Sequence, residues 1–223
     1  MKNVAIILAR GGSKGIKNKN IIKIKNKPLI YWSIKSCLQS SKIDSVWVSS
    51  DNGKILSLSK SFGANIIKRP KQISKDNSKS EKAWLHAIKY LRSRSMSFDT
   101  VIGVQPTSPA RPKKVFDSAL KQFYKNGFDS LFTAQKISDY FIWTKKNKKF
   151  FANYNFKNRP MRQMITEKFL ENGSFYIFNS TKFLKTKCRL FGKIGCFVMD
   201  KIYSFQIDDF EDVKLIKKLT NYI

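Results

Sequence analysis

The stretch "VAIILARGGSKG", residues 4–15, joins a run of apolar residues to a loop that contains three glycines. A short, continuous apolar run of this kind is typical of a strand that is buried on both faces, as in a parallel sheet. Gly11 and Gly12 allow backbone N–H groups to approach an anion, and Arg10 and Lys14 can neutralise phosphate oxygens. The loop fits neither GxxxxGK[ST] nor GxGxxG, so these residues alone leave open an ordinary glycine-rich turn.

Apolar runs and helix-like segments alternate along the rest of the chain. We expect further strands at 45–51, 65–69, 100–106, 130–137, 173–179 and 193–199. We expect helices at 28–40, 53–63, 78–93, 113–127, 180–186 and 208–223. This alternation predicts an α/β fold that is Rossmann-like, with a mainly parallel sheet flanked by helices.

The length of 223 residues favours a single domain that spans the whole chain, 1–223. Residues 140–170 have no clean period and cluster lysines, asparagines and aromatic residues. We expect a hairpin excursion or a dimerisation lobe there. Ser78 and Glu81 have the spacing of a capping box and predict the start of the helix at 78–93.

The formal net charge is +29, from 44 Lys and Arg residues against 15 Asp and Glu residues. Such a charge raises nucleic acid as a partner. The lysines are spread from end to end, however, and no helix-turn-helix, zinc-finger or RRM-like signature accompanies them. We therefore interpret the charge as background composition and expect no specific nucleic-acid binding.

Other classes of protein are disfavoured by cysteine usage and hydropathy. Three cysteines without a CxxC pair, together with a single histidine, support neither a disulfide framework nor a zinc site. No apolar run approaches the roughly 18 residues that a membrane span needs, and the N-terminus lacks the layout of a signal peptide. We expect a cytoplasmic protein.

Polar motifs lie at several predicted strand ends, where open α/β sheets bind their ligands. After "RGGSKGIKNKN" (10–20) come "VSSD" (48–51), "QPTSP" (105–109), "ENGSFY" (171–176) and "QIDD" (206–209). In this order, and over nearly the full length, these motifs resemble the acylneuraminate cytidylyltransferase family, whose members activate nine-carbon acidic sugars as CMP derivatives.

The resemblance implies a reaction and its partners. CMP would pass from CTP to the anomeric hydroxyl of a nine-carbon acidic sugar, either N-acetylneuraminic acid or a legionaminic or pseudaminic relative, with release of pyrophosphate. It also implies a homodimer in which the excursion of one subunit reaches the site of the other. The alternatives are a degenerate family member without full activity and a basic nucleic-acid-binding protein.

Site residues follow from the resemblance position by position. The positions implied to bind the nucleotide are Arg10, Gly11, Gly12, Ser13, Lys14, Asn20, Arg69, Ser78 and Gln105. Those implied to bind the sugar are Gln105, Arg159, Arg162, Asn172 and Tyr176. The implied catalytic residues are Arg10, Lys14, Asp208 and Arg162, and the choice between Arg159 and Arg162 stays open.

The chain departs from the family at the metal site. The family commonly carries an Asp-Ile-Asp triplet that holds Mg²⁺ (or Mn²⁺), whereas this chain has Gln206, Ile207 and Asp208. An amide is a weaker Mg²⁺ ligand than a carboxylate, so the metal arrangement and full activity are in question. We predict that Asp208 binds the metal. The alternative is that Asp208 caps the last helix, because Asp208 and Glu211 have capping-box spacing.

Overall fold

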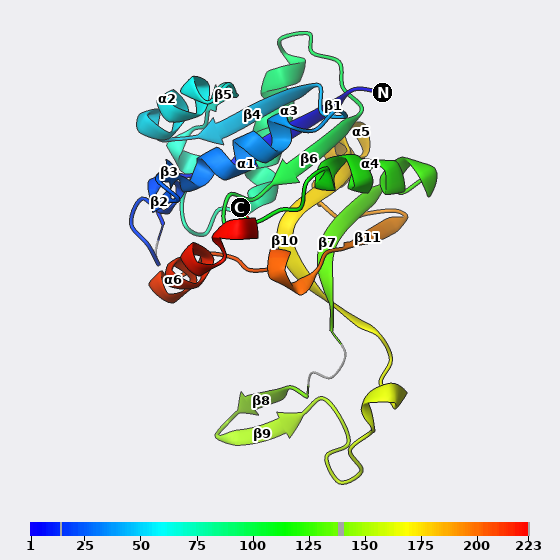
Figure 1. Ribbon diagram of the computed structural model, residues 1–223. Helices are drawn as coiled ribbons and strands as arrows, with labels where there is room; N and C mark the ends of the chain where they lie inside the picture. Colours follow the sequence, from blue (N-terminus) through cyan, green and yellow to red (C-terminus); the bar gives the residue numbers. More distant parts are fainter. Residues whose placement is uncertain (14, 138–140, 223) are drawn as a thin grey trace.

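A computed structural model describes residues 1–13, 15–137 and 141–222. In this part of the chain the main sheet has seven strands in the order β11-β7-β10-β6-β1-β4-β5 (Figure 1). Their bounds are β1 (Asn3–Leu8), β4 (Ser45–Ser50), β5 (Asn65–Lys68), β6 (Thr100–Val104), β7 (Ser130–Ile137), β10 (Lys168–Asn179) and β11 (Ile194–Val198). Strand β10 is antiparallel to both of its neighbours, and the other four pairs are parallel. The predicted α/β fold with a mainly parallel sheet is confirmed.

Helices cover both faces of the sheet (Figure 1). One face carries α1 (Leu29–Leu38), α2 (Gly53–Ser61) and α4 (Val115–Lys125), and the other carries α3 (Ser80–Arg92) and α5 (Ser180–Thr186). Side chains of β1 alternate between these layers: Ala5 and Ile7 join the first core cluster, while Val4 and Ile6 join the second. The continuous apolar run is thus explained by burial on both faces.

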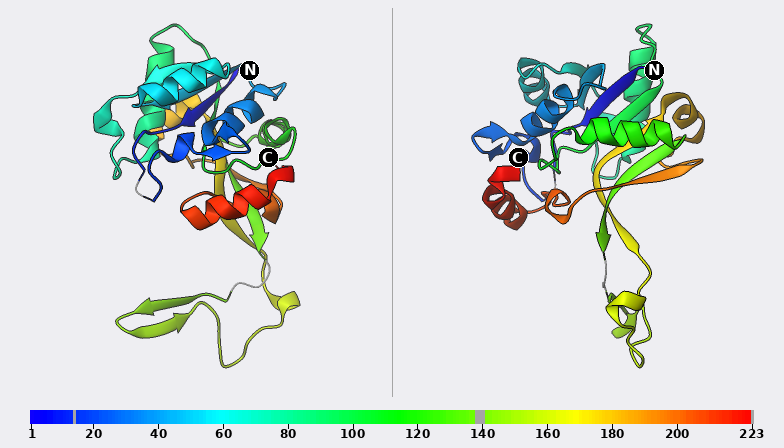
Figure 2. Two further views of the ribbon diagram at one scale, coloured as in Figure 1. Left: turned by 60° about the vertical axis from the view of Figure 1, so that its left-hand side comes forward. Right: turned by 45° about the vertical axis from the view of Figure 1, so that its right-hand side comes forward.

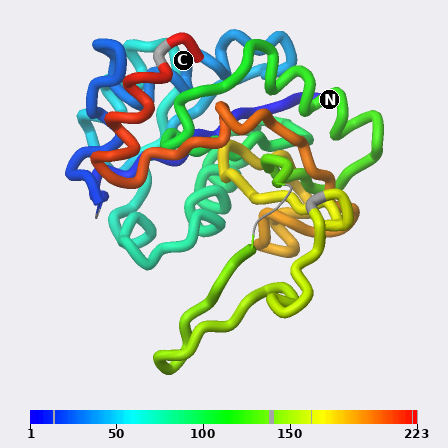
Figure 3. Tube along the Cα trace, turned by 60° about the horizontal axis from the view of Figure 1, so that its bottom comes forward, coloured from blue at the N-terminus to red at the C-terminus, as the bar shows by residue number. Residues whose placement is uncertain are grey.

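Helix α6 (Phe210–Lys218) packs near the N-terminal loop rather than on the main sheet (Figure 3). Its Val213 and Ile216 share a buried cluster with Ile16 and with Ile24 of the short hairpin β2 (Lys23–Ile24) and β3 (Lys27–Pro28). This packing brings the segment that precedes α6 next to the loop that follows β1.

A hairpin arm, residues 141–167, stands away from the sheet (Figures 1 and 2). It contains β8 (Trp143–Lys146) and β9 (Lys149–Ala152), and it lies within residues 140–170, where the sequence predicts an excursion. Its exposed apolar side chains are Ile142, Trp143, Phe150, Phe151, Phe156, Met161 and Met164. Strand β10 begins earlier than predicted because residues 168–171 still pair with β7, before a register shift.

Some local details differ from expectation. The predicted capping box at Ser78 and Glu81 is wrong: α3 begins at Ser80 after Lys79, and no side chain in the described part of the chain caps it. Glu81 instead accepts a hydrogen bond from Arg189 Nε at 2.7 Å. The short 3₁₀ segments are η1 (Lys19–Ile21), η2 (Lys71–Ile73), η3 (Arg162–Met164), η4 (Lys201–Tyr203) and η5 (Thr220–Tyr222).

Among the described helices, none combines the length and the apolar character that crossing a bilayer requires.

Candidate functional site

A cavity of about 420 Å³ opens at the carboxyl ends of the parallel strands, where this fold class places ligands. Its walls come from the loop after β1, the segment after β5, the start of α3, the turn after β6 and the residue before the α6 cap. The predicted site residues that line it are Arg10, Ser13, Asn20, Arg69, Ser78, Gln105 and Asp208. Seven positions that are far apart in the sequence therefore converge on one space.

The loop after β1 is held by hydrogen bonds between its backbone and polar side chains. Gly11 N donates to the Asp51 carboxylate at 2.9 Å, and the side chain of Asn20 donates to the Arg10 carbonyl at 2.9 Å. A Cβ at Gly11 would lie 2.8 Å from the side chain of Asn52, so glycine is required there. A Cβ at Gly12 would meet open space.

Two arginines give the cavity positive charge. Arg69 is buried, and its Nε donates to Ser74 Oγ at 3.0 Å. Burial lowers the pKa of Arg69; Asp51 opposes that change and the nearby Arg10 adds to it. Arg10 is paired with the carboxylate of Asp76, across the cavity. Both cations are placed to meet an anion. Lys14, the third predicted cation, lies outside the described residues.

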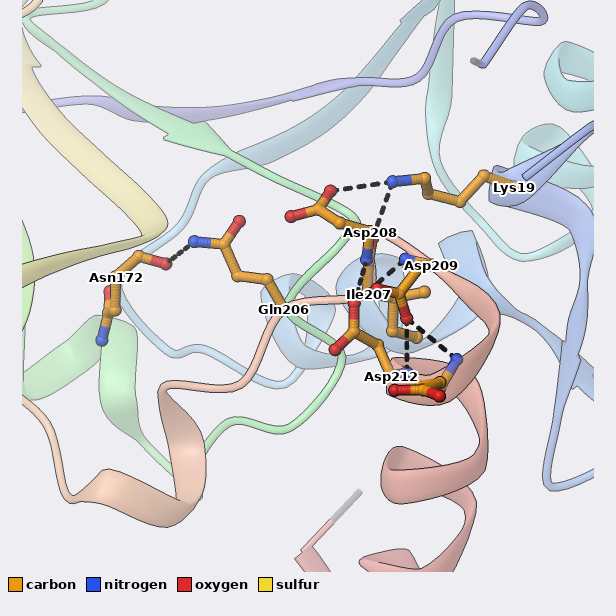
Figure 4. A network of polar contacts seen from close by, with 8 residues as sticks. Lys19, Asn172, Gln206, Ile207, Asp208, Asp209 and Asp212 are labelled. Atoms are coloured by element: carbon orange, nitrogen blue, oxygen red, sulfur yellow. Dashed lines mark hydrogen bonds and ion pairs between the residues drawn. The ribbon is translucent and has the colours of Figure 1, made fainter. Parts of the chain in front are cut away.

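Lys19 is a cavity residue that the sequence prediction missed. Its Nζ lies 2.9 Å from the Asp208 carboxylate and donates to the Ile207 carbonyl at 2.7 Å (Figure 4). The Lys19 side chain is 12% exposed, whereas that of Asp208 is 74% exposed. The available signal was its position directly before Asn20, but the excess of lysines obscured it. A Cβ at Gly15 would lie 2.4 Å from the Asp208 carbonyl oxygen, so glycine lets the two segments meet.

The helix cap of α6 is formed by other acids than predicted. The Asp209 carboxylate accepts hydrogen bonds from the N–H groups of Glu211 and Asp212, and Asp212 returns the contact to Asp209 N, which completes a capping box. The alternative in which Asp208 and Glu211 form the box is therefore wrong. The Asp208 carboxylate is left facing Lys19 and the cavity.

Gln206 turns away from Asp208. Its Nε2 donates to the carbonyl oxygen of Asn172, and Figure 4 shows its amide directed at Asn172 while the Asp208 carboxylate is directed at Lys19. In the described part of the chain, no three His, Cys, Asp or Glu side chains form a group that could hold a metal. Mg²⁺ is nevertheless often bound by one or two carboxylates together with substrate phosphates and water, so Asp208 fits such an ion.

Of the residues predicted to bind the sugar, Gln105 lines this cavity, whereas Asn172 and Tyr176 are not part of its described lining. Asn172 is buried, donates to Ser204 Oγ at 3.0 Å and accepts from Ser174 N. The Tyr176 hydroxyl donates to Glu171, and burial raises the pKa of Tyr176 to about 12.

The two candidate arginines for the acidic sugar belong to the arm region. The Arg159 guanidinium lies over the Phe141 ring, 4.1 Å from its centroid. Arg162 begins η3, and its side chain lies outside what the structure describes.

Arg111 braces the turn after β6, a role that the sequence did not indicate. It is 8% exposed, and its guanidinium donates to Ser174 Oγ, Ser33 Oγ and the Gln105 carbonyl at 3.1, 2.9 and 2.7 Å. Burial lowers the pKa of Arg111 to about 10. By holding the Gln105 carbonyl, Arg111 fixes one wall of the cavity.

Comparison with known proteins identifies the family of this chain. Residues 4–221 match the family described as "Cytidylyltransferase". The chain belongs to this family. The pseudaminic acid cytidylyltransferase of Campylobacter jejuni is 32% identical over 225 residues, which cover 98% of this chain and 96% of that protein. The predicted resemblance is confirmed, and this cytidylyltransferase groups with nucleotidyltransferases of the acylneuraminate type.

Other relatives are longer than this cytidylyltransferase. N-acylneuraminate cytidylyltransferase A of Danio rerio is 34% identical over 92% of this chain, but the match covers only 47% of that protein. The chain thus spans about half the length of that relative. Among solved structures, the CMP:2-keto-3-deoxy-manno-octonic acid synthetase complexed with CTP aligns with a TM-score of 0.74 at 16% identity and covers 99% of both chains. This likeness shows the shared fold.

Proposed function

We propose that this cytidylyltransferase transfers CMP from CTP to the anomeric hydroxyl of a nonulosonic acid of the sialic or pseudaminic type. The observation that carries the proposal is the convergence of Arg10, Lys19 and Arg69 with the Asp208 carboxylate on one cavity at the strand ends. The names of its relatives supply the chemical class of the sugar.

In the proposed reaction the sugar hydroxyl attacks the α-phosphorus of CTP in line, and pyrophosphate leaves. Negative charge grows on the phosphate oxygens, so positioning and cationic stabilisation supply most of the catalysis. Arg10 would exchange Asp76 for the triphosphate, and backbone N–H groups near Gly12 and Ser13 would face it. Lys14 would add a further charge.

The metal would be held by Asp208. Mg²⁺ or Mn²⁺ bound there would neutralise phosphate charge. Lys19 keeps the Asp208 carboxylate aimed at the cavity by an ion pair. Asp209 and Asp212 complete the α6 cap, which fixes the backbone directly behind Asp208.

The sugar site would be completed by a second subunit. We propose a homodimer in which the arm, residues 141–167, carries Arg159 and Arg162 toward the acid sugar of the partner site. Large exposed apolar side chains on the arm support an interface there, because monomeric proteins rarely expose such patches. Asn172 and Tyr176 stay proposed sugar contacts. One catalytic domain, 1–223, acting in the cytoplasm, where CTP is available, completes this proposal.

The test is pyrophosphate release from purified protein with CTP, Mg²⁺ and one acid sugar at a time. We expect release with at least one of N-acetylneuraminic, legionaminic and pseudaminic acid, and none without sugar. If the folded protein releases no pyrophosphate with any of the three, the proposed function is wrong.

A second candidate, a member with reduced activity, is favoured by the orientation of Gln206 toward Asn172. The variant Gln206→Asp would return the second carboxylate of the family triplet. A large gain in the rate of pyrophosphate release would support reduced activity in the natural chain. Normal turnover of the natural chain, unchanged by the substitution, would dismiss this candidate.

A further inference from the structure

A second cavity, of about 680 Å³, lies beside the same turn that forms the first. Residues 105–107 of the turn line the first cavity, while Pro109, Arg111 and Pro112 line the second. The other walls are α1, the first turn of α4, Tyr203 and residues 221–222. The volume lies within the range of sites for small organic ligands.

The charge around this cavity is of one sign. Its described lining includes the cations Lys35, Arg111, Lys113 and Lys114 and contains no acidic residue. The neighbouring acid Asp117 is engaged by the hydroxyl groups of Ser40 and Ser41. The cavity therefore presents an excess of positive charge that an anion would balance.

Arg111 distinguishes this cavity from the basic background of the surface. It is more than nine-tenths buried, and among the described residues its guanidinium donates to neutral oxygen atoms of Ser33, Gln105 and Ser174. A buried guanidinium without a carboxylate is electrostatically costly, so an anion in the adjacent space would be stabilised.

Aromatic rings form the remaining wall. The Tyr203 and Tyr222 rings pack edge to face with 5.9 Å between their centroids, and Tyr222 is 44% exposed. The Trp32 indole N–H is already used by the Ile24 carbonyl, so the ring offers the cavity an apolar surface. Rings of this kind stack on a nucleobase with little regard to its identity.

We propose that this second cavity binds a nucleoside phosphate, with its phosphates against the cations and its base against the tyrosine rings. The site is separate from the CTP cavity and does not depend on the proposed function, because it is tested by binding alone.

The experiment is equilibrium dialysis with labelled ADP at about 150 mM salt, where long-range attraction between exposed charges is largely screened. The test variant is Lys35→Ala/Lys113→Ala, which removes two exposed lysines that line the cavity, one from α1 and one from the segment before α4. The matched control is Lys121→Ala/Lys125→Ala, which removes the same charge from exposed positions farther along α4. The variant Arg10→Ala removes a cation from the first cavity, so it shows whether ADP binds there instead.

We expect ADP binding to survive in the control and in Arg10→Ala and to weaken at least tenfold in Lys35→Ala/Lys113→Ala. Tyr222→Ala should also weaken ADP binding but leave the weaker binding of inorganic phosphate unchanged. Wild-type ADP affinity in Lys35→Ala/Lys113→Ala, loss of all binding in Arg10→Ala, or equal affinities for ADP and phosphate would overturn the proposal. Each of these outcomes can be interpreted even if the protein releases no pyrophosphate from CTP, because they are measured by binding.

Discussion

The cavity at the strand ends and the hairpin arm use their side chains in opposite ways. In the cavity, polar groups are held by short contacts within one chain, such as Gly11 N to Asp51 and Asn20 to the Arg10 carbonyl. On the arm, Phe150 and Phe151 are 62% and 54% exposed. The first region is preorganised by the single chain, whereas the second has an apolar surface that only another molecule could bury.

We expect the largest effect from removing a cation from the preorganised cavity at the strand ends. We expect Arg10→Ala to lower kcat/KM for pyrophosphate release by about 10²- to 10³-fold, the usual effect of losing one donor to transition-state charge. Steady-state kinetics would measure it. Arg94→Ala removes an exposed arginine that lies over Tyr90, and it should have no such effect. A loss of less than fivefold in Arg10→Ala would show that the loop does not hold the triphosphate.

The adjacent acids Asp208 and Asp209 should separate catalysis from stability. We expect Asp208→Asn to lower kcat by about 10²-fold, because the carboxylate that faces Lys19 is lost. Asp209→Ala removes the helix cap and should cost about 1 kcal/mol of unfolding free energy while activity stays within a few-fold. Kinetics and thermal unfolding of both variants would decide. The reverse pattern would assign the functional carboxylate to Asp209.

The sequence predicted the α/β fold well because its strongest signals are local. The apolar run of β1 and the glycines that end predicted helices depend on neighbouring residues alone, and the strands and helices follow them closely. The cavity followed from a general property of parallel sheets, whose loops gather at the carboxyl edge. Arg10, Arg69 and Gln105 could thus be grouped without a structure.

The sequence prediction failed where two interpretations differ by one residue or where the contacts are long-range. Capping-box spacing suits Asp208 and Asp209 almost equally, and only the backbone geometry selects Asp209. Lys19 was one lysine among many until its contact with Asp208, 189 positions away, was visible. Arg111 gave no local signal because its partners lie on β10, on α1 and in the turn after β6, far from one another in the sequence.

The arm gives a third, smaller effect. If a second copy covers it, Phe150→Ser/Phe151→Ser should shift the protein to monomers in sedimentation experiments and lower activity by about tenfold at low protein concentration. Thermal stability of the monomer should change little, since these rings are exposed within one chain. Leu38→Ser, at a 49% exposed position on α1, serves as the control. A wild-type chain that is already monomeric would contradict the proposed homodimer.

The smallest effect concerns the ion pair between Arg10 and Asp76, whose side chains are 31% and 43% exposed. A partly exposed pair contributes at most about 1 kcal/mol, so Asp76→Asn should tighten CTP binding by no more than about fivefold. Titration calorimetry would measure this, with the exposed Asp200→Asn as the control. If Asp76 competes with the triphosphate for Arg10, the gain must vanish in the Arg10→Ala background. A gain that persists there would mean that Asp76 repels the nucleotide directly, and weaker CTP binding would make Asp76 part of the binding site.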